Sequence, residues 1–269
     1  MTALLRLPRQ LYQRLFREAV RQRAIGRHYL AGAFPPRLFR SALRGYPRYL
    51  RDRRRYTRLV APGELDRYDD NPQLHDWTPS SPFDPHYTYQ DAWAAREIHA
   101  AAPGYHVDVG SRVTFVIGLA AFVRTVFIDL RPLEVDIPNL EPRAGSILDL
   151  PFDDASVASL SCLHVAEHIG LGRYGDPLDP EGTVKAAREL ARVLAPGGAL
   201  YFALPIGRQR TEFNAHRVHD PRAVPAMFAD LELVSFAAVG DDGRYAEPAE
   251  LEDYAESDWS CGLYMFTRR

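Results

Sequence analysis

The sequence predicts an α/β fold with a doubly wound, largely parallel sheet, preceded by a basic helical extension. Between residues 89 and 205, apolar segments of strand length alternate with segments of helical periodicity. This alternation is typical of a parallel sheet that helices cover on both faces. The first 60 residues are much richer in arginine than the rest. A chain of 269 residues with 46% hydrophobic residues can bury a sizeable core.

The elements expected before residue 150 are short. The spacing of apolar residues predicts a helix over 89–102, a strand over 105–109, a short helix within 113–122 and a strand over 125–129. A further short strand is expected near 145–148.

The stretch from Ile147 to Pro205 is the most informative part of the chain. An apolar strand over 157–162 ends in a polar cluster, and a helix of about four turns then leads through Pro196-Gly197-Gly198 into a second apolar strand. In such units ligands bind at the carboxyl ends of the strands. A substrate is therefore expected beside the cluster, which comprises His164, Glu167 and His168.

Two apolar segments, 231–239 and 262–267, follow, and the segment 241–260 between them is polar. Because it contains no helix-length apolar pattern, the two segments are predicted to close the sheet as antiparallel strands.

Charge divides the chain into two regions. Residues 1–60 contain 16 arginines and two acidic residues, a net charge of +14, whereas the rest carries −16. The segment from Pro62 to Pro85 is rich in Pro, Asp and Ser, which is typical of a boundary. We expect a basic, mainly helical extension over 1–75 and a catalytic domain over 76–269.

The beginning of the extension has the pattern of an amphipathic helix. Leucines recur at helical spacing from Leu4 to Leu15, and arginines fill much of the remainder. Such a helix binds an anionic membrane surface or an acidic partner, or packs its apolar stripe on the catalytic domain. Pro35-Pro36 and Pro47 are expected to break the extension into short pieces. The acidic remainder and the lack of a nucleic-acid-binding module argue against nucleic acid as a partner.

The cysteines and apolar runs predict a cytoplasmic protein, peripheral at the inner membrane face if the extension binds lipid. Cys162 and Cys261 are too few for a disulfide framework. The longest apolar run, Val113–Val123, is about half the length that spans a bilayer. Arg6 interrupts the first apolar run, so no signal-peptide core is expected.

The turn after the first strand, YHVDVGSRV, has features of a nucleoside-binding turn. Gly110 allows a ligand to approach the backbone, and Asp129 ends the next strand, where an acid binds ribose hydroxyls. Ser111 and Arg112 stand where a dinucleotide-binding loop has further glycines. The sequence therefore favours a nucleoside ligand without phosphates.

Four segments resemble the class I S-adenosylmethionine (SAM)-dependent methyltransferases in order and spacing: VDVGS, FIDL, DLPFDDASVASLSCLHVAEH and RVLAPGGALYFALP. The resemblance covers about residues 86–269 and implies a Rossmann-like, mostly parallel seven-stranded sheet with an antiparallel last strand. The segments HYTYQDAW, LGRYGDP, EFNAHR and GLYMF resemble a branch of uncharacterised bacterial proteins often encoded beside surface-polysaccharide enzymes. That resemblance implies a saccharide acceptor.

The resemblance implies SAM as the cofactor, with its methionine part near the first turn, its ribose at the second strand end and its adenine near residue 146. The implied cofactor-binding residues are Asp108, Gly110, Ser111, Asp129, Ser146 and Ile147. Ser146 replaces an acid that the family often uses to receive the adenine amino group. Arg112 replaces a glycine, and it either pairs with the cofactor's carboxylate or crowds the site.

Methyl transfer to a hydroxyl needs an acceptor oxygen held in line with the methyl group and a base that removes its proton. His164 is the first candidate for this base, with Glu167 to orient it or bind the acceptor. His216 is the second candidate, from the segment EFNAHRVH. The predicted acceptor-binding residues are His168, Asp176 and His219.

The segment His164-Val-Ala-Glu167-His168 also matches the H-x-x-E-H zinc motif of inverzincin proteases. That motif requires a stable helix, but a strand precedes the segment and Gly170 and Gly172 follow it. No metal is therefore expected.

Three functions remain open. The leading one is SAM-dependent O-methylation of a saccharide or another small hydroxylated acceptor. A non-catalytic methyltransferase-like scaffold in a glycan-assembly complex is the alternative, which the altered glycine loop favours. An NAD-dependent oxidoreductase is disfavoured because the pyrophosphate glycines are missing.

Overall fold

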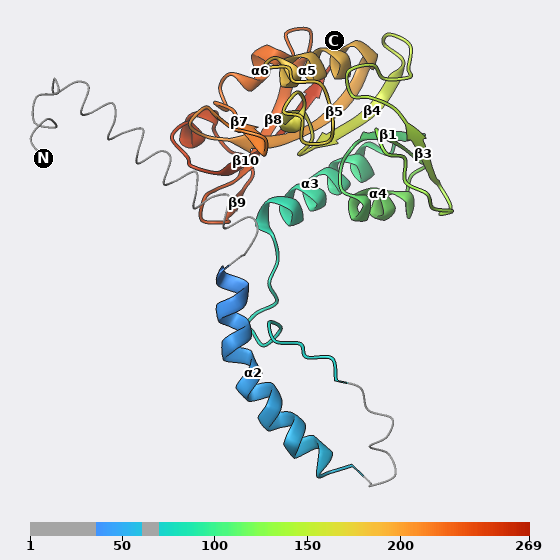
Figure 1. Cartoon of the computed structure of the whole chain (residues 1–269). Helices are drawn as coiled ribbons and strands as arrows, with labels where there is room; N and C mark the ends of the chain where they lie inside the picture. The colour runs from blue at the N-terminus through green and yellow to red at the C-terminus, as the bar shows by residue number, and fades with distance from the viewer. Residues whose placement is uncertain (1–35, 61–69) are drawn as a thin grey trace, which may run out of the picture. The chain divides into compact units, whose positions relative to one another are not determined.

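The computed structural model describes residues 36–60 and 70–269 (Figure 1). Two compact units divide the chain, Met1–Pro82 and Phe83–Arg269. The helix predicted at the beginning of the extension lies outside the described residues.

The described residues of the second unit build an eight-stranded sheet in the order β3-β2-β1-β4-β5-β10-β8-β9. The pairs from β3 to β5 are parallel, and β10 runs antiparallel to both neighbours, β5 and β8. The bounds are β3 Leu140–Ala144, β2 Thr125–Asp129, β1 His106–Val109, β4 Val157–Leu163, β5 Leu194–Ile206, β10 Ser260–Thr267, β8 Glu232–Val239 and β9 Tyr245–Ala246. The predicted fold class is confirmed, and the two-residue β9 extends the expected seven strands.

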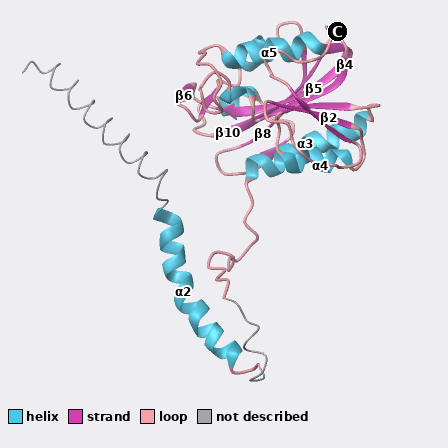
Figure 2. Ribbon diagram, turned by 45° about the vertical axis from the view of Figure 1, so that its right-hand side comes forward, coloured by secondary structure: helices cyan, strands magenta, loops and turns pink. Residues whose placement is uncertain are grey.

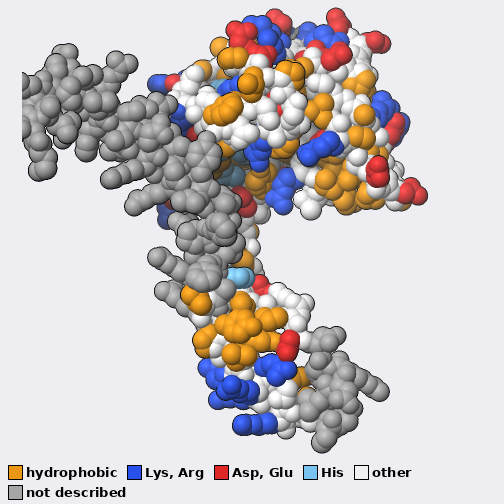
Figure 3. All heavy atoms as spheres, in the orientation of Figure 1, with side chains coloured by type: hydrophobic (Ala, Val, Ile, Leu, Met, Phe, Trp, Pro, Cys, Tyr) orange, Lys and Arg blue, Asp and Glu red, His pale blue; other side chains and the backbone are white. Residues whose placement is uncertain are grey.

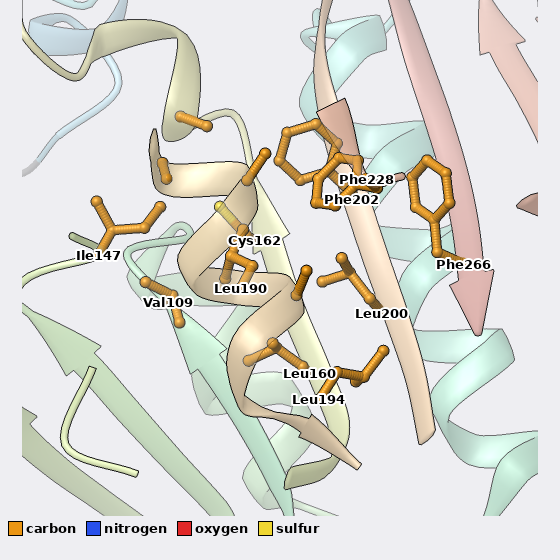
Figure 4. Packing of buried hydrophobic residues seen from close by; sticks show 14 of the residues in the cluster. Val109, Ile147, Leu160, Cys162, Leu190, Leu194, Leu200, Phe202, Phe228 and Phe266 are labelled. Atoms are coloured by element: carbon orange, nitrogen blue, oxygen red, sulfur yellow. The ribbon is translucent and has the colours of Figure 1, made fainter. Parts of the chain in front are cut away.

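Helices cover both faces of this sheet (Figure 2). The helices α3 (Pro85–Ala101) and α4 (Val113–Ala120) lie on one face, where Trp93, Ile98 and Leu119 are fully buried. The helix α5 (Gly182–Val193) lies on the other, and Leu190 packs there with side chains of β4 and β5 (Figure 4). The short α6 (Val224–Met227) adds Val224 to the same cluster. The two hydrophobic layers fix the sheet between them.

The helix α3 begins four residues before the predicted start at residue 89. Asp84 caps it, since its carboxylate accepts a hydrogen bond from the Tyr87 backbone N–H, and Pro85 occupies the first turn. Proline is favourable there because the first N–H groups of a helix lack intrahelical partners.

Two strand predictions are wrong in position. The third strand is 140–144, not 145–148, and only Leu140 of its residues is buried, so no apolar pattern marks it. Residues 146–149 form a tight turn instead, in which the Ser146 hydroxyl accepts from the Leu148 N–H at 3.1 Å. Pro196-Gly197-Gly198 is part of β5 and does not precede it, because the strand continues through an irregularity opposite β4.

The described part of the first unit contains one long helix, α2 (Pro36–Thr57). The prediction that prolines divide the extension is therefore wrong for Pro47, which lies inside this helix. Pro36 is its first residue, where proline is tolerated. At Pro47 the helix loses one backbone hydrogen bond, and the surrounding Leu, Arg and Ala residues favour helix strongly enough to continue it.

Apolar and basic side chains share the surface of α2 and the turn that follows it (Figure 3). The exposed apolar residues are Leu43, Tyr46, Leu50, Tyr56 and Leu59. The Arg48 guanidinium lies 4.4 Å from the ring centroid of Trp77. Among the described helices, none has the length and apolar character that a membrane crossing requires.

Two glycines provide a matched test of the packing. A Cβ added at Gly182, the first residue of α5, would lie 2.1 Å from the Ile169 carbonyl oxygen, whereas one at Gly118 in α4 would meet nothing within 4 Å. Gly182→Ala should therefore lower the free energy of unfolding by roughly 1–3 kcal/mol. Gly118→Ala should raise it by about 0.5–1 kcal/mol. Urea denaturation measures both, and equal effects would contradict the packing described for α5.

Candidate active site

A pocket opens at the carboxyl ends of β1, β2 and β4, where a parallel sheet of this order binds ligands. Its lining comes from the ends of these strands and from the segments that follow them. The residues are Val109, Gly110, Ile128, Asp129, Leu130, Arg131, Gly145, Ile147, His164, Val165, His168, Ile169 and Tyr174. Three of the six predicted cofactor residues, Gly110, Asp129 and Ile147, line it together.

The backbone conformation just after β1 requires a glycine at position 110. Its φ is +70°, a left-handed conformation that side chains disfavour, and its N–H donates to the Ile128 carbonyl at 2.8 Å. A Cβ here would lie 3.0 Å from a Val165 methyl group. The glycine thus keeps the chain close to its neighbours and leaves the pocket open.

Asp129 is the acidic group of the pocket at the end of β2. One carboxylate oxygen accepts a hydrogen bond from the Arg131 N–H at 2.8 Å, which orients the side chain. Its second oxygen receives no hydrogen bond from any described residue and is free to accept from a ligand. This is the position at which the sequence predicts ribose binding.

Asp108 and Ser111 do not line the pocket, because a buried polar network between β1 and β4 holds them. Asp108 accepts hydrogen bonds from the Ser161 hydroxyl and the Ser111 N–H. The His106 ring bridges Ser161 and Ser159, with 2.8 Å to each hydroxyl. Because Ser161 donates to Asp108, the His106 Nε2–H donates to Ser161 and Nδ1 accepts from Ser159.

Burial changes the proton affinity of both ionisable groups of this network. It raises the pKa of Asp108 to about 7, although its hydrogen bonds from Ser161 and Ser111 oppose the shift. It lowers the pKa of His106 to about 3. The network is therefore close to neutral under mildly acidic conditions, and it serves to join the two strands.

Two side chains hold the ring of His164, the residue that follows β4. Its φ is +56°, its Nδ1 lies 2.9 Å from a Glu167 carboxylate oxygen, and its Nε2 lies 3.2 Å from the Cys261 sulfur. Burial lowers its pKa, but the interactions with the Cys261 sulfur and the Glu167 carboxylate outweigh burial and raise that pKa well above its usual value. Both ring nitrogens are thus engaged within the protein.

His168 lines the pocket and has one ring nitrogen without a hydrogen bond among the described residues. Its Nδ1 donates to the Ala215 carbonyl at 2.6 Å, which leaves Nε2 with a lone pair, 3.7 Å from a Glu167 oxygen. Burial lowers the pKa of His168, so the ring is neutral at neutral pH. A neutral, oriented imidazole is suited to accept a proton.

His216 and His219 lie on or beside β7 (His216–Val218). His216 contacts Trp259, with ring centroids 4.2 Å apart, and its Nε2 lies 3.3 Å from a Glu212 oxygen. Its ring centroid is 6.5 Å from that of His168, which places it next to the pocket lining. His219 is buried and outside the lining, and burial lowers its pKa to about 4.

Asp176 and Ser146 also lie outside the lining. The Asp176 carboxylate accepts from the Gly170 N–H at 2.6 Å and the Tyr174 N–H at 3.2 Å, so it closes the loop that follows His168. Arg112 is also absent from the lining, and its guanidinium lies 4.7 Å from the ring centroid of Tyr87. Arg112 therefore does not crowd the pocket.

Sequence reasoning did not identify several groups of the site. Arg131 and Tyr174 line the pocket from opposite loops, with the guanidinium 5.1 Å from the ring centroid. The buried Arg217 donates to the carbonyls of Ile169 and Asp179, which anchors the loop before α5. Tyr174 lies in LGRYGDP, a segment that could have indicated it, but no local signal marks Arg217.

The H-x-x-E-H segment lacks the helix that a zinc protease motif needs. Only Ala166–His168 forms a single 3-10 turn, η2, and His164 precedes it in a left-handed conformation. The two histidines of the motif point to different partners, Cys261 and the Ala215 carbonyl.

Comparison with known proteins agrees with this architecture. The sequence signature of a family described as "Caenorhabditis protein of unknown function, DUF268" matches residues 152–253, and no curated protein matches the chain. A geranyl diphosphate methyltransferase solved with SAM shares 12% identity at a TM-score of 0.50, over 68% of this chain and 85% of that one. The chain shares the Rossmann-like fold of that structure.

Two further solved structures are similar at lower scores. The N-methyltransferase NodS from Bradyrhizobium japonicum, solved with S-adenosylhomocysteine, has a TM-score of 0.48 and 16% identity over 77% of this chain and 97% of that one. The [4+2]-cyclase SpnF has a TM-score of 0.49 and 14% identity over 66% of this chain and 81% of that one. The reaction must be argued from the site, because one fold serves many activities.

The raised pKa of Asp108 predicts a dependence of stability on pH. The folded value of about 7 exceeds the ordinary 3.8, so the folded state holds the proton more tightly. This contribution is complete below about pH 4 and is lost as pH rises through 7. Relative to Asp108→Asn, the wild type should therefore lose on the order of 3 kcal/mol of unfolding free energy between pH 4 and pH 8. Urea denaturation across this range tests it, and parallel curves for the two proteins would refute the assignment.

Proposed function

We propose that this protein is a SAM-dependent methyltransferase that transfers the methyl group to a hydroxyl of a saccharide or another small acceptor. The pocket itself carries the proposal. It combines the open backbone at Gly110, a free carboxylate oxygen at Asp129 and the apolar Ile147, in the order that the methionine, ribose and adenine parts of SAM require. It has no glycine-rich cradle for a pyrophosphate, which argues against NAD.

SAM, when bound, would supply an activated methyl group on a sulfonium. Asp129 would accept hydrogen bonds from the ribose hydroxyls, and Ile147 would contact the adenine ring. An acceptor oxygen held in line with that methyl group would take it in exchange for the carbon–sulfur bond, and a base in the protein would accept the hydroxyl proton. The products are the methyl ether and S-adenosylhomocysteine.

The geometry supports His168 as this base ahead of His164 and His216. His168 lines the pocket, its Nδ1–H is fixed on a backbone carbonyl, and its Nε2 is free to accept. His164 uses both nitrogens within the protein. Glu167 lies between the two rings, where its carboxylate stabilises positive charge on either one.

The partner proposals concern the extension. Exposed apolar and arginine side chains on α2 support contact with an anionic membrane surface, at its cytoplasmic face, or with an acidic partner. If the pocket binds no SAM, the alternative function, a non-catalytic scaffold, is favoured. Arg112 no longer favours that alternative, because it points toward Tyr87.

Cofactor binding tests the pocket directly. S-adenosylhomocysteine should raise the unfolding temperature of the wild type, and NAD should not. Asp129→Ala should weaken S-adenosylhomocysteine about 10- to 100-fold, since it removes charge-assisted hydrogen bonds to the ribose. The exposed Asp136→Ala is the matched control. Equal affinities of the two variants, measured by calorimetry, would exclude the assigned ribose site.

The base is tested by turnover, measured as S-adenosylhomocysteine released from SAM with a panel of soluble saccharides. His168→Gln should lower kcat about 100-fold or more while cofactor affinity stays within about twofold. Because burial lowers the pKa of His168, the acid limb of the wild-type profile should lie below pH 6.5. Wild-type turnover in His168→Gln would exclude His168 as the base. The same assay on His164→Gln and His216→Gln would then show which of these two histidines is the base.

A further inference from the structure

Three side chains with metal-binding atoms converge beside the pocket. His86 comes from the second residue of α3, His164 from the end of β4, and Cys261 from the start of β10. Their ligand atoms all lie within 4.8 Å of one another, and all three residues are buried. We propose that His86, His164 and Cys261 bind a zinc ion.

The donor set matches zinc chemistry. One thiolate and two neutral imidazoles are typical zinc ligands, and three protein ligands leave one position of the tetrahedron open. Bond lengths of about 2.3 Å to sulfur and 2.0–2.1 Å to nitrogen place tetrahedral ligand atoms roughly 3.3–3.6 Å apart. The His164 Nε2 and the Cys261 sulfur are already 3.2 Å apart. The distances from the His86 ligand atom to the other two are at most 4.8 Å, so closing the set needs only a small movement of the His86 ring.

Each histidine ring makes a hydrogen bond to the protein that orients it, as is usual for metal-binding histidines. The His164 Nδ1 bonds to Glu167 at 2.9 Å, which fixes that side of the ring and directs Nε2 toward Cys261. The His86 ring bonds to the backbone of Trp259. Each ring therefore has one nitrogen fixed on the protein, and the His164 Nε2, which contacts the Cys261 sulfur, would exchange that contact for a bond to the metal.

The charges of this region also favour a divalent cation. Glu167 is almost completely buried, and its second oxygen has no hydrogen-bond partner among the described residues. The Glu167 carboxylate and a Cys261 thiolate together carry two negative charges, which a zinc ion neutralises. Nothing in the assignment depends on methyl transfer, so the site stands or falls independently of the proposed function.

The segment that delivers Cys261 is held firmly by Asp241. The Asp241 carboxylate accepts from the N–H groups of Asp258 and Trp259 at 2.8 Å each, and from the Ser260 hydroxyl at 2.9 Å. Asp241 thus fixes Trp259, whose backbone bonds to the His86 ring, and Ser260, the residue before Cys261. A prepositioned ligand set loses little conformational entropy on binding a metal.

The proposal differs from the H-x-x-E-H motif, and it replaces the expectation of no metal. His168 takes no part, because its Nδ1 donates to the Ala215 carbonyl and its Nε2 lies toward Glu167. His164 and Cys261 are 97 positions apart in the chain, a separation that no spacing motif describes.

Metal titration of the full chain tests the site. After removal of metal with a chelator, the wild type should bind one equivalent of Zn²⁺ or Co²⁺ and unfold at a higher temperature when loaded. The cobalt form should show a thiolate-to-cobalt charge-transfer band and the strong visible bands of tetrahedral cobalt. Cys261→Ser should abolish the charge-transfer band, and His86→Gln should weaken zinc about 100-fold or more. Glu167→Gln should weaken it about 10- to 100-fold.

The matched controls are His99→Gln on the exposed side of α3 and Cys162→Ala, the other buried cysteine, and both should bind zinc like the wild type. A wild type without the thiolate-to-cobalt band overturns the proposal even if a variant fails to fold. Zinc affinity unchanged in both His86→Gln and Cys261→Ser also overturns it. Loss of zinc in His168→Gln with full binding in His86→Gln would assign the metal to the H-x-x-E-H segment instead.

Discussion

The hydrogen bonds that join β1 to β4 through buried polar side chains are the constraint on which the site depends. Asp108, Ser161, His106 and Ser159 connect the two strands inside the core, where an unpaired polar group is costly. The network fixes the end of β1 against the end of β4. Gly110 follows β1 and His164 follows β4. The network therefore fixes the positions of the proposed cofactor and acceptor sides of the pocket relative to each other.

Much of the fold could be predicted because its strands and helices carry their own periodic patterns. The strand 125–129 is marked by a continuous apolar run, which a parallel strand needs where both faces of the sheet are covered. The antiparallel β8 is marked by the apolar residues of its buried second half. The strand β3 could not be found in this way, because it lies at the sheet edge and buries only Leu140. At Pro47 the sequence predicted a break that does not occur. The tendency of proline to end a helix was weaker there than the helix-forming tendency of the surrounding residues.

The candidate site was predictable only where its residues follow strand ends. Gly110 and Asp129 occupy such positions, and the sequence placed both in the pocket that the structure contains. Asp108 lies one residue before the end of β1, and its carboxylate is used by the core network. Cys261 escaped prediction because it enters through an antiparallel strand, whose beginning and not its end lies beside the pocket. Which histidine holds a free nitrogen depends on contacts such as the Ala215 carbonyl, which no sequence pattern specifies.

The position of β10 has a consequence for how the chain folds during its synthesis. This strand separates β5 from β8, although it follows both of them in the chain. While a ribosome is still making the segment after β8, the strands β1 to β5 can pair, but β8 and β9 have no edge of the sheet to join. The hydrophobic faces of β8 remain uncovered until β10 leaves the exit tunnel, and that interval is when a nascent chain of this topology is most exposed to chaperones and to aggregation.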